Sequence, residues 1–224
     1  RHIREKGVVS CVGYQFRYVD SNQRARAVLA DVPIGLVIAI RLGALPSTPW
    51  WRVQSMSGGM LIEQHTHGVD MMRYLAGDVV AVSAFANTTI LAGTPNLDIA
   101  DVNSATCRFA NGAVGSIINT CAAPQGGPQN LAGPVHVMAK ELTVSADPHG
   151  ATIMRPGQPP EVIAATTSGN VEMNRAFIHA VANGDTGALQ STYSDALKSF
   201  EITYAAHLSS TRGGEMIDLT QPYE

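Results

Sequence analysis

The sequence predicts an α+β fold that contains a largely antiparallel sheet. Short strand-like segments follow one another through residues 79–165 with only short turns between them, and such strands pair antiparallel. Helical segments precede and follow this run. The 224 residues, of which 45% are hydrophobic and 15% charged, are enough for one large globular domain, or for one domain and a fragment of another.

The first residues are expected to be the end of a neighbouring domain. Residues 1–6 have the character of a helix end, and Gly7 suits the position just after it. Residues 8–13 form a short apolar run that predicts a buried strand. A doubly wound α/β domain can finish in this way, so we expect the sequence to begin late in a longer protein.

Two helices and one long strand are predicted before the run of short strands. A helix is expected over about residues 22–30, and strict alternation of apolar side chains predicts a strand over residues 34–42. Gly58 and Gly59 then form a turn that opens a helix, expected to occupy residues 57–77.

The run of short strands contains one strong hairpin signal. Asn111 and Gly112 form the dipeptide that favours a two-residue hairpin turn, and strand-like segments flank it on both sides. The segments expected to be strands are residues 79–90, 101–109, 113–121, 134–140, 142–146, 151–155 and 161–165.

Two helices are expected near the C-terminal end. The first covers about residues 170–183, the second about residues 194–210, and a short extended piece follows at 216–219. The apolar side chains expected to face the core are Met173, Phe177, Val181, Leu197, Phe200, Tyr204 and Leu208.

Composition excludes several classes of function. A net charge of −3 lacks the basic footprint of a nucleic-acid binder, and no apolar run is long enough to cross a membrane. Cys11, Cys107 and Cys121 show no paired spacing, which favours a reducing compartment. We therefore expect a cytoplasmic protein with no nucleic-acid partner and no membrane partner.

The helix expected at 57–77 carries the main candidate site. Glu63, His67 and Asp70 are spaced four and three residues apart, so an imidazole is expected to lie between two carboxylates. That arrangement suits a histidine that transfers protons. The alternatives are a solvated or capping set without chemistry and, less favoured, a metal site. His65 would lie on another helical face, and the motif H-E-x-x-H is absent.

Three segments, taken in order, carry a resemblance to a known family. They are residues 12–18, the glycine-led segment 58–77, and residues 174–219. Together they resemble the C-terminal half of glucose–fructose oxidoreductase and inositol dehydrogenase proteins, the Gfo/Idh/MocA family. The segments bracket nearly the whole sequence.

The resemblance implies a two-domain protein. Family members have an N-terminal Rossmann domain that holds NAD or NADP, followed by a domain with an open, mostly antiparallel sheet and helices packed on one face, similar to that of dihydrodipicolinate reductase. Residues 1–13 would then be the remnant of the Rossmann domain. Residues 14–224 would be the substrate-binding and oligomerisation domain, which often forms homo-dimers or tetramers through its sheet.

The resemblance also assigns roles to the glycine-led segment. His67 matches the family histidine that accepts a proton from the substrate hydroxyl or orients it. Glu63 matches an acidic position that is usually aspartate, and Asp70 matches a position that braces the helix. Gly58 and Gly59 would support the tight entry to the helix.

Other positions match segments that line the family's substrate pocket. These are Gln15 and Arg17 of the first segment, and the pair Trp51 and Arg52. An arginine donates several hydrogen bonds in a planar fork, and an aromatic face packs well on the C–H surface of a sugar. The alternatives are a core anchor for Trp51, and a surface charge or structural ion pair for Arg17 and Arg52.

The implied activity is oxidation or reduction of a sugar, inositol or related polyol by hydride transfer. The sequence has no G-x-G-x-x-G, so we expect no cofactor to bind tightly to this chain and no turnover by the chain alone. A glycosidase that uses NAD transiently and a non-catalytic assembly domain are the alternative functions.

Overall fold

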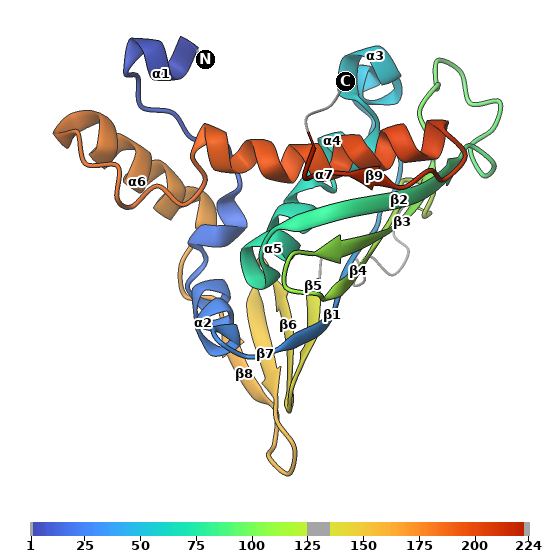
Figure 1. The fold of residues 1–224 in the computed structure, drawn as a ribbon. Helices are drawn as coiled ribbons and strands as arrows, with labels where there is room; N and C mark the ends of the chain where they lie inside the picture. Colours follow the sequence, from blue (N-terminus) through green and yellow to red (C-terminus); the bar gives the residue numbers. More distant parts are fainter. Residues whose placement is uncertain (1, 125–134, 222–224) are drawn as a thin grey trace.

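A computed structural model describes residues 2–124 and 135–221 and contains a nine-stranded sheet, shown in Figure 1. The strand order is β8-β7-β6-β5-β1-β4-β3-β2-β9. Only β1 and β4 pair in parallel, and every other neighbouring pair is antiparallel. The strands are β1 (Ile34–Leu42), β2 (Val79–Asn87), β3 (Val102–Phe109), β4 (Val114–Thr120), β5 (Val135–Ala139), β6 (Leu142–Asp147), β7 (Gly150–Met154), β8 (Glu161–Ala164) and β9 (Ile217–Asp218).

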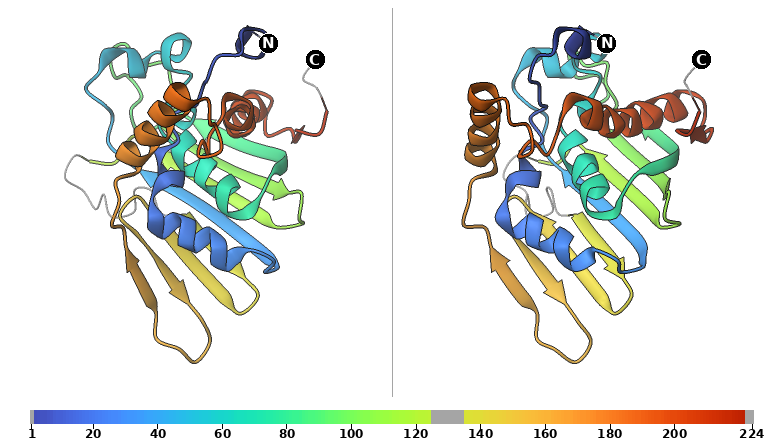
Figure 2. Two further views of the ribbon diagram at one scale, coloured as in Figure 1. Left: turned by 90° about the vertical axis from the view of Figure 1, so that its left-hand side faces the viewer. Right: turned by 60° about the vertical axis from the view of Figure 1, so that its left-hand side comes forward.

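Helices cover one face of this sheet. α2, α5 and α7 lie on the same side of the strands in Figure 2, and the apolar core fills the space between. The alternation in β1 explains the layer, because Val37 and Ala39 are buried under the helices while Ile38 points to the other face. The α+β fold with an open, mostly antiparallel sheet is confirmed. The helices are α1 (His2–Lys6), η1 (Gln15–Tyr18), α2 (Asp20–Leu29), η2 (Pro49–Arg52), α3 (Gln54–Ser57), α4 (Met60–Glu63), α5 (Thr66–Ala76), α6 (Gly169–Asn183) and α7 (Tyr193–Thr211).

The glycine-led segment is not the continuous helix that was predicted. It is broken into α3, α4 and α5, because Gly58 and Gly59 adopt φ values of 74° and 90° that no helix can hold. A second break falls at Gln64 and His65, between α4 and α5. Glu63 and His67 therefore lie on different helices, and their proximity comes from the turn rather than from helical spacing.

The strand predicted at residues 8–13 is also wrong. Gly7, at φ 61°, ends α1, and the following segment forms only an isolated bridge between Cys11 and Thr192. The N–H of Val12 donates to the carbonyl of Ser191 at 2.9 Å. This segment therefore pairs with the connection between α6 and α7 rather than with the sheet.

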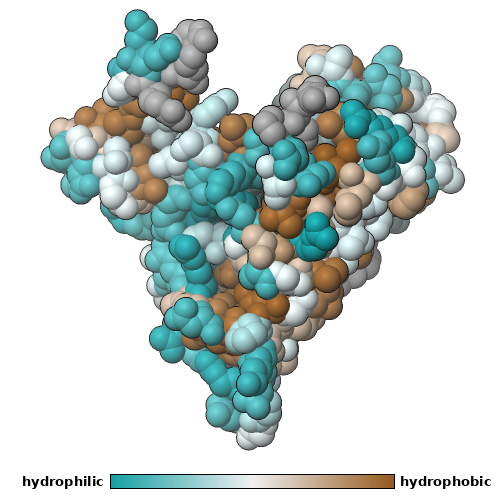
Figure 3. Space-filling model, viewed as in Figure 1, coloured by the Kyte–Doolittle hydropathy of each residue, from teal (hydrophilic) through white to brown (hydrophobic). Residues whose placement is uncertain are grey.

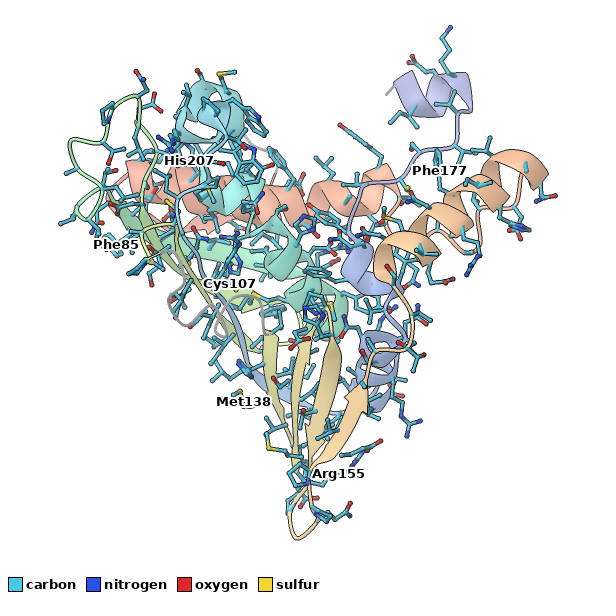
Figure 4. The ribbon with its side chains drawn as sticks, turned by 180° about the vertical axis from the view of Figure 1, so that it is seen from behind. Phe85, Cys107, Met138, Arg155, Phe177 and His207 are labelled. Carbon is cyan, nitrogen blue, oxygen red and sulfur yellow. The ribbon has the colours of Figure 1, made fainter. Side chains whose placement is uncertain are left out.

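The last two helices expose apolar side chains that were expected to face the core. Val181 of α6 and Leu197, Phe200 and Tyr204 of α7 are exposed, so their predicted orientation is corrected. α6 lies away from the sheet, and Figure 3 shows apolar surface on the arm that carries it. In Figure 4, Phe177 of α6 lies on the opposite side of the molecule from Phe85 of β2, and Arg155 marks the far end at the β7–β8 hairpin.

None of the helices within residues 2–124 and 135–221 combines the length and the apolar character that a membrane span needs.

Candidate active site

His67 lies in the first turn of α5 and is enclosed by aromatic side chains from the N-terminal segment. Its ring centroid is 5.9 Å from that of Tyr14, edge to face, and 5.5 Å from that of Phe16. The Tyr14 hydroxyl shares a 2.8 Å hydrogen bond with Thr66 Oγ1, which fixes η1 and its flanking residue against α5. The imidazole is thus held by packing from a segment about fifty residues earlier in the chain.

Burial determines the protonation of His67. It lowers the pKa of the imidazole, an effect that Asp70 and Glu63 oppose and that Arg41 reinforces. Nδ1 is buried and has no hydrogen-bond partner among the described residues. The ring is therefore neutral near pH 7, which leaves it able to accept a proton.

Glu63 ends α4 and is held by its neighbour. Gln64 Nε2 donates a short hydrogen bond to Glu63 Oε2, and Gln64 Oε1 accepts one from Arg41 Nη2 at 3.2 Å. The carboxylate of Glu63 also contributes to the electrostatic environment of His67. The structure therefore brings the predicted pair, His67 and Glu63, together. It adds a third group, Arg41, which the sequence did not indicate.

Asp70 supports α5 from inside the protein. It is 1% exposed and accepts two hydrogen bonds from Arg17, at 2.8 Å from Nε and 2.5 Å from Nη2, and a third from Ser199 Oγ at 2.6 Å. Burial raises the pKa of Asp70, and the Arg17 guanidinium acts against that rise. All of these contacts join α5, the helix that carries His67, to η1 and α7.

The guanidinium of Arg17, a residue expected to line a substrate pocket, is held by acceptors of the protein itself. Its side chain is 4% exposed, and Nη1 donates to Asp195 Oδ2 at 2.5 Å and to the Gln190 carbonyl at 2.7 Å, in addition to the bonds to Asp70. Arg73 also binds Asp195. With every guanidinium nitrogen occupied by protein acceptors, Arg17 is part of a structural ion-pair network.

Trp51 and Arg52 occupy η2, and the partners of their side chains are close in sequence. Arg52 donates to the Pro46 carbonyl from Nε at 3.3 Å and from Nη2 at 3.2 Å. The Trp51 ring packs edge to face on Trp50 at 5.5 Å, and its buried Nε1 has no partner among the described residues. Within the described residues, no recorded contact joins this pair to His67.

Gln15 lines a cleft of about 400 Å³ together with Phe16 and residues 165–170. A second cleft, of about 590 Å³, is lined by Arg17, Arg26, Arg73 and Tyr74, among others. Neither His67 nor Glu63 lines either cleft in the described part of the chain. Phe16 lines the same cleft as Gln15 and also packs on the His67 ring.

Tyr14, Phe16, Arg41 and Gln64 are the site residues that sequence reasoning missed. One signal was present, since Arg41 is the only charged residue in the apolar strand 34–42. The others have no local signal, because their roles depend on contacts between distant segments. No group of three or more His, Cys, Asp and Glu side chains within residues 2–124 and 135–221 is arranged to hold a metal ion.

Known proteins resemble this chain in sequence and in fold. A levoglucosan dehydrogenase from Pseudarthrobacter phenanthrenivorans is 31% identical over 143 residues, which are 51% of this chain and 37% of that protein. The uncharacterized oxidoreductase YrbE from Bacillus subtilis is 26% identical over 132 residues, or 58% of this chain and 38% of that protein. The chain thus spans less than two fifths of these curated relatives.

Solved structures extend the likeness over nearly the whole chain. A levoglucosan dehydrogenase in complex with NADH and L-sorbose aligns with a TM-score of 0.81 at 21% identity, covering 98% of this chain and 68% of that one. GenD2 from gentamicin A biosynthesis, in complex with NAD, aligns with a TM-score of 0.76 at 25% identity, covering 96% and 65%. Residues 22–136, just over half of the chain, match the GFO/IDH/MocA C-terminal domain, and the chain therefore belongs to that family.

Proposed function

We propose that this chain is the substrate-binding and oligomerisation part of an NAD(P)-dependent oxidoreductase that acts on a sugar, inositol or related polyol by hydride transfer. The observation that carries the proposal is His67, a half-buried imidazole whose pKa is lowered by burial, with the Glu63 and Asp70 carboxylates nearby. The family membership and the names of the relatives, a levoglucosan dehydrogenase and a structure with NADH and L-sorbose, support the substrate class.

The glycine pair before α4, Gly58 and Gly59, does not form a cradle for the phosphates of a dinucleotide. The amide of Gly58 donates to the Gln54 carbonyl at 2.9 Å and that of Gly59 to Ser57 Oγ at 3.0 Å, so neither is free to bind a phosphate. The space beside Gly59 is occupied by the Gln54 side chain. We propose that NAD or NADP is held by a separate nucleotide-binding domain, consistent with the greater length of the relatives.

This chain would then contribute the proton-accepting half of the reaction. A neutral His67 can take the proton of a substrate hydroxyl as the carbon is oxidised, and Glu63 and Asp70 stabilise the imidazolium that forms. Tyr14 and Phe16 exclude water from one side of the ring, which strengthens these charge interactions.

The experiment is a rate comparison in the full-length protein with NAD⁺ or NADP⁺ and a panel of polyols and sugars that includes levoglucosan. We expect His67→Asn to lower kcat by about 10²- to 10⁴-fold, the usual contribution of a positioned acid–base group. His179→Asn is the matched control, because His179 is exposed on α6. An unchanged rate for His67→Asn would instead favour a non-catalytic assembly domain. Hydrolysis of a glycoside without accumulation of reduced cofactor would favour the glycosidase alternative.

We also propose that the face of the sheet opposite the helices joins copies of the chain. Val114 and Ile118 of β4 are 47% and 38% exposed on that face, and their register partners on β1 are Leu36 and Ile40. Together they form an apolar stripe of the kind that marks an interface. We expect Ile118→Glu to dissociate the oligomer in light scattering, and a wild-type chain that is already monomeric would refute this part of the proposal.

A further inference from the structure

Arg41 occupies an unusual place for a charged side chain. It follows Val37 and Ala39 on the helix-covered face of β1, and its Cα is in register with that of Asn119 on β4. A Cβ on Gly43 would lie 2.8 Å from Arg41 Nη1, so the missing side chain at Gly43 leaves room for the guanidinium. Within the described residues Arg41 has no carboxylate partner, and its buried Nη1 has no acceptor.

The guanidinium connects the sheet to Glu63 through one amide. Arg41 Nη2 donates to Gln64 Oε1, and Gln64 Nε2 donates to Glu63 Oε2. Arginine can only donate and an ionised glutamate can only accept, so a single orientation of the Gln64 amide satisfies both. Gln64 lies in the break between α4 and α5, where the backbone alone does not fix the direction of the Glu63 carboxylate.

Arg41 and Glu63, at the two ends of this hydrogen-bond series, shift the pKa of His67 in opposite directions. The positive charge of Arg41 lowers the pKa of His67, whereas Asp70 and Glu63 raise it. His65, which lies in the same break, is held neutral by burial with a pKa of about 4, so it adds no charge to the group near pH 7. Removal of Arg41 should therefore change both the placement of Glu63 and the protonation of His67.

We propose that Arg41 is a positioning residue of the active site, which acts through Gln64 to hold the Glu63 carboxylate beside His67. The inference rests on the proposed oxidoreductase function. Under this proposal Arg41, Gln64 and Glu63 act as one unit. Replacement of either Arg41 or Gln64 would release the Glu63 carboxylate from its position. A purely structural arginine would affect folding without a specific change in the chemical step.

The test uses the full-length enzyme with its cofactor and the substrate that the wild type oxidises. We expect Arg41→Met and Gln64→Leu each to lower kcat by about 10- to 100-fold, the range expected when a reacting group is misplaced. Because both act through Glu63, the double variant should be no slower than the slower single variant. KM for the cofactor and the melting temperature should stay near the wild-type values, and Arg24→Met on the surface of α2 is the matched control.

The pH profile separates charge from geometry. Activity that needs neutral His67 rises with pH through its pKa, so loss of the Arg41 charge should move the acidic limb of kcat/KM to higher pH in Arg41→Met. Arg41→Lys keeps the charge and should leave that limb in place while kcat still falls. If Arg41→Met fails to fold, Gln64→Leu carries the kcat test alone.

Two outcomes would overturn the inference: wild-type kcat in Gln64→Leu, or multiplied losses in the double variant. A His67→Asn enzyme with an unchanged rate would instead overturn the proposed function itself, so the two failures can be told apart.

Discussion

The ion pair between Arg17 and Asp70 makes a prediction about stability that can be worked from the structure. Both side chains are buried, and two hydrogen bonds of 2.8 and 2.5 Å join them. Removal of one partner of such a pair leaves an uncompensated buried charge and costs about 3–5 kcal/mol. In a domain of this size that loss lowers the melting temperature by about 6–20 °C. We therefore expect Arg17→Met and Asp70→Leu each to reduce the free energy of unfolding by about 3–5 kcal/mol.

The assay is urea denaturation of the single variants, the double variant and an exposed-pair control. Arg175→Met removes an exposed pair with Glu172 and should cost less than about 1 kcal/mol. The double variant leaves neither charge unpaired, so its loss should be smaller than the sum of the single losses by about 2 kcal/mol or more. If the sum of the two single losses equals the loss of the double variant to within about 0.5 kcal/mol, the reasoning is refuted, because independent sites behave in that way.

Three other residues give predictions of stability. Burial holds the pKa of His65 at about 4, so only the unfolded chain binds a proton there as the pH falls from about 6.5 to 4. Over this range the free energy of unfolding of the wild type should fall by about 3 kcal/mol more than that of His65→Gln, measured by denaturation at each pH. Gly115→Ala would place a Cβ 2.8 Å from the Phe109 ring and should cost about 1–3 kcal/mol, measured by urea midpoint. Thr192→Ala removes the side-chain cap of α7 and should cost about 1 kcal/mol in thermal melts; an unchanged midpoint would contradict the capping role.

Local patterns predicted those elements whose determinants lie within the element. The alternation over residues 34–42 matched β1 at both ends, and Asn111 with Gly112 marked the β3–β4 hairpin. The same reasoning failed at residues 57–77, where two left-handed glycines and a turn outweigh the helical spacing. The apolar pattern of α7 suggested one buried face, but exposure depends on what packs there, and no local pattern reports that.

The sequence predicted only that part of the candidate site whose residues are close together in the chain. His67 and Glu63 are close in sequence, and the turn between their helices keeps them close in space. The ion pairs of Arg17 could not be predicted, because its partners, Asp70 and Asp195, lie 53 and 178 residues away. Long-range ion pairs leave no periodic signal in the sequence, so their members cannot be told from pocket residues without the fold.

The network around Arg17 also sets an order of events during synthesis. α5 is fixed to α7 by the bonds from Arg73 to Asp195 and from Ser199 to Asp70, and 125 residues separate Asp70 from Asp195. At about 5–20 residues per second, a ribosome needs roughly 6–25 s to make that stretch. During this interval Asp70 and Arg17 are without their last partners. A nascent chain stalled before residue 195 would therefore lack the contacts by which α7 fixes α5, the helix that carries His67.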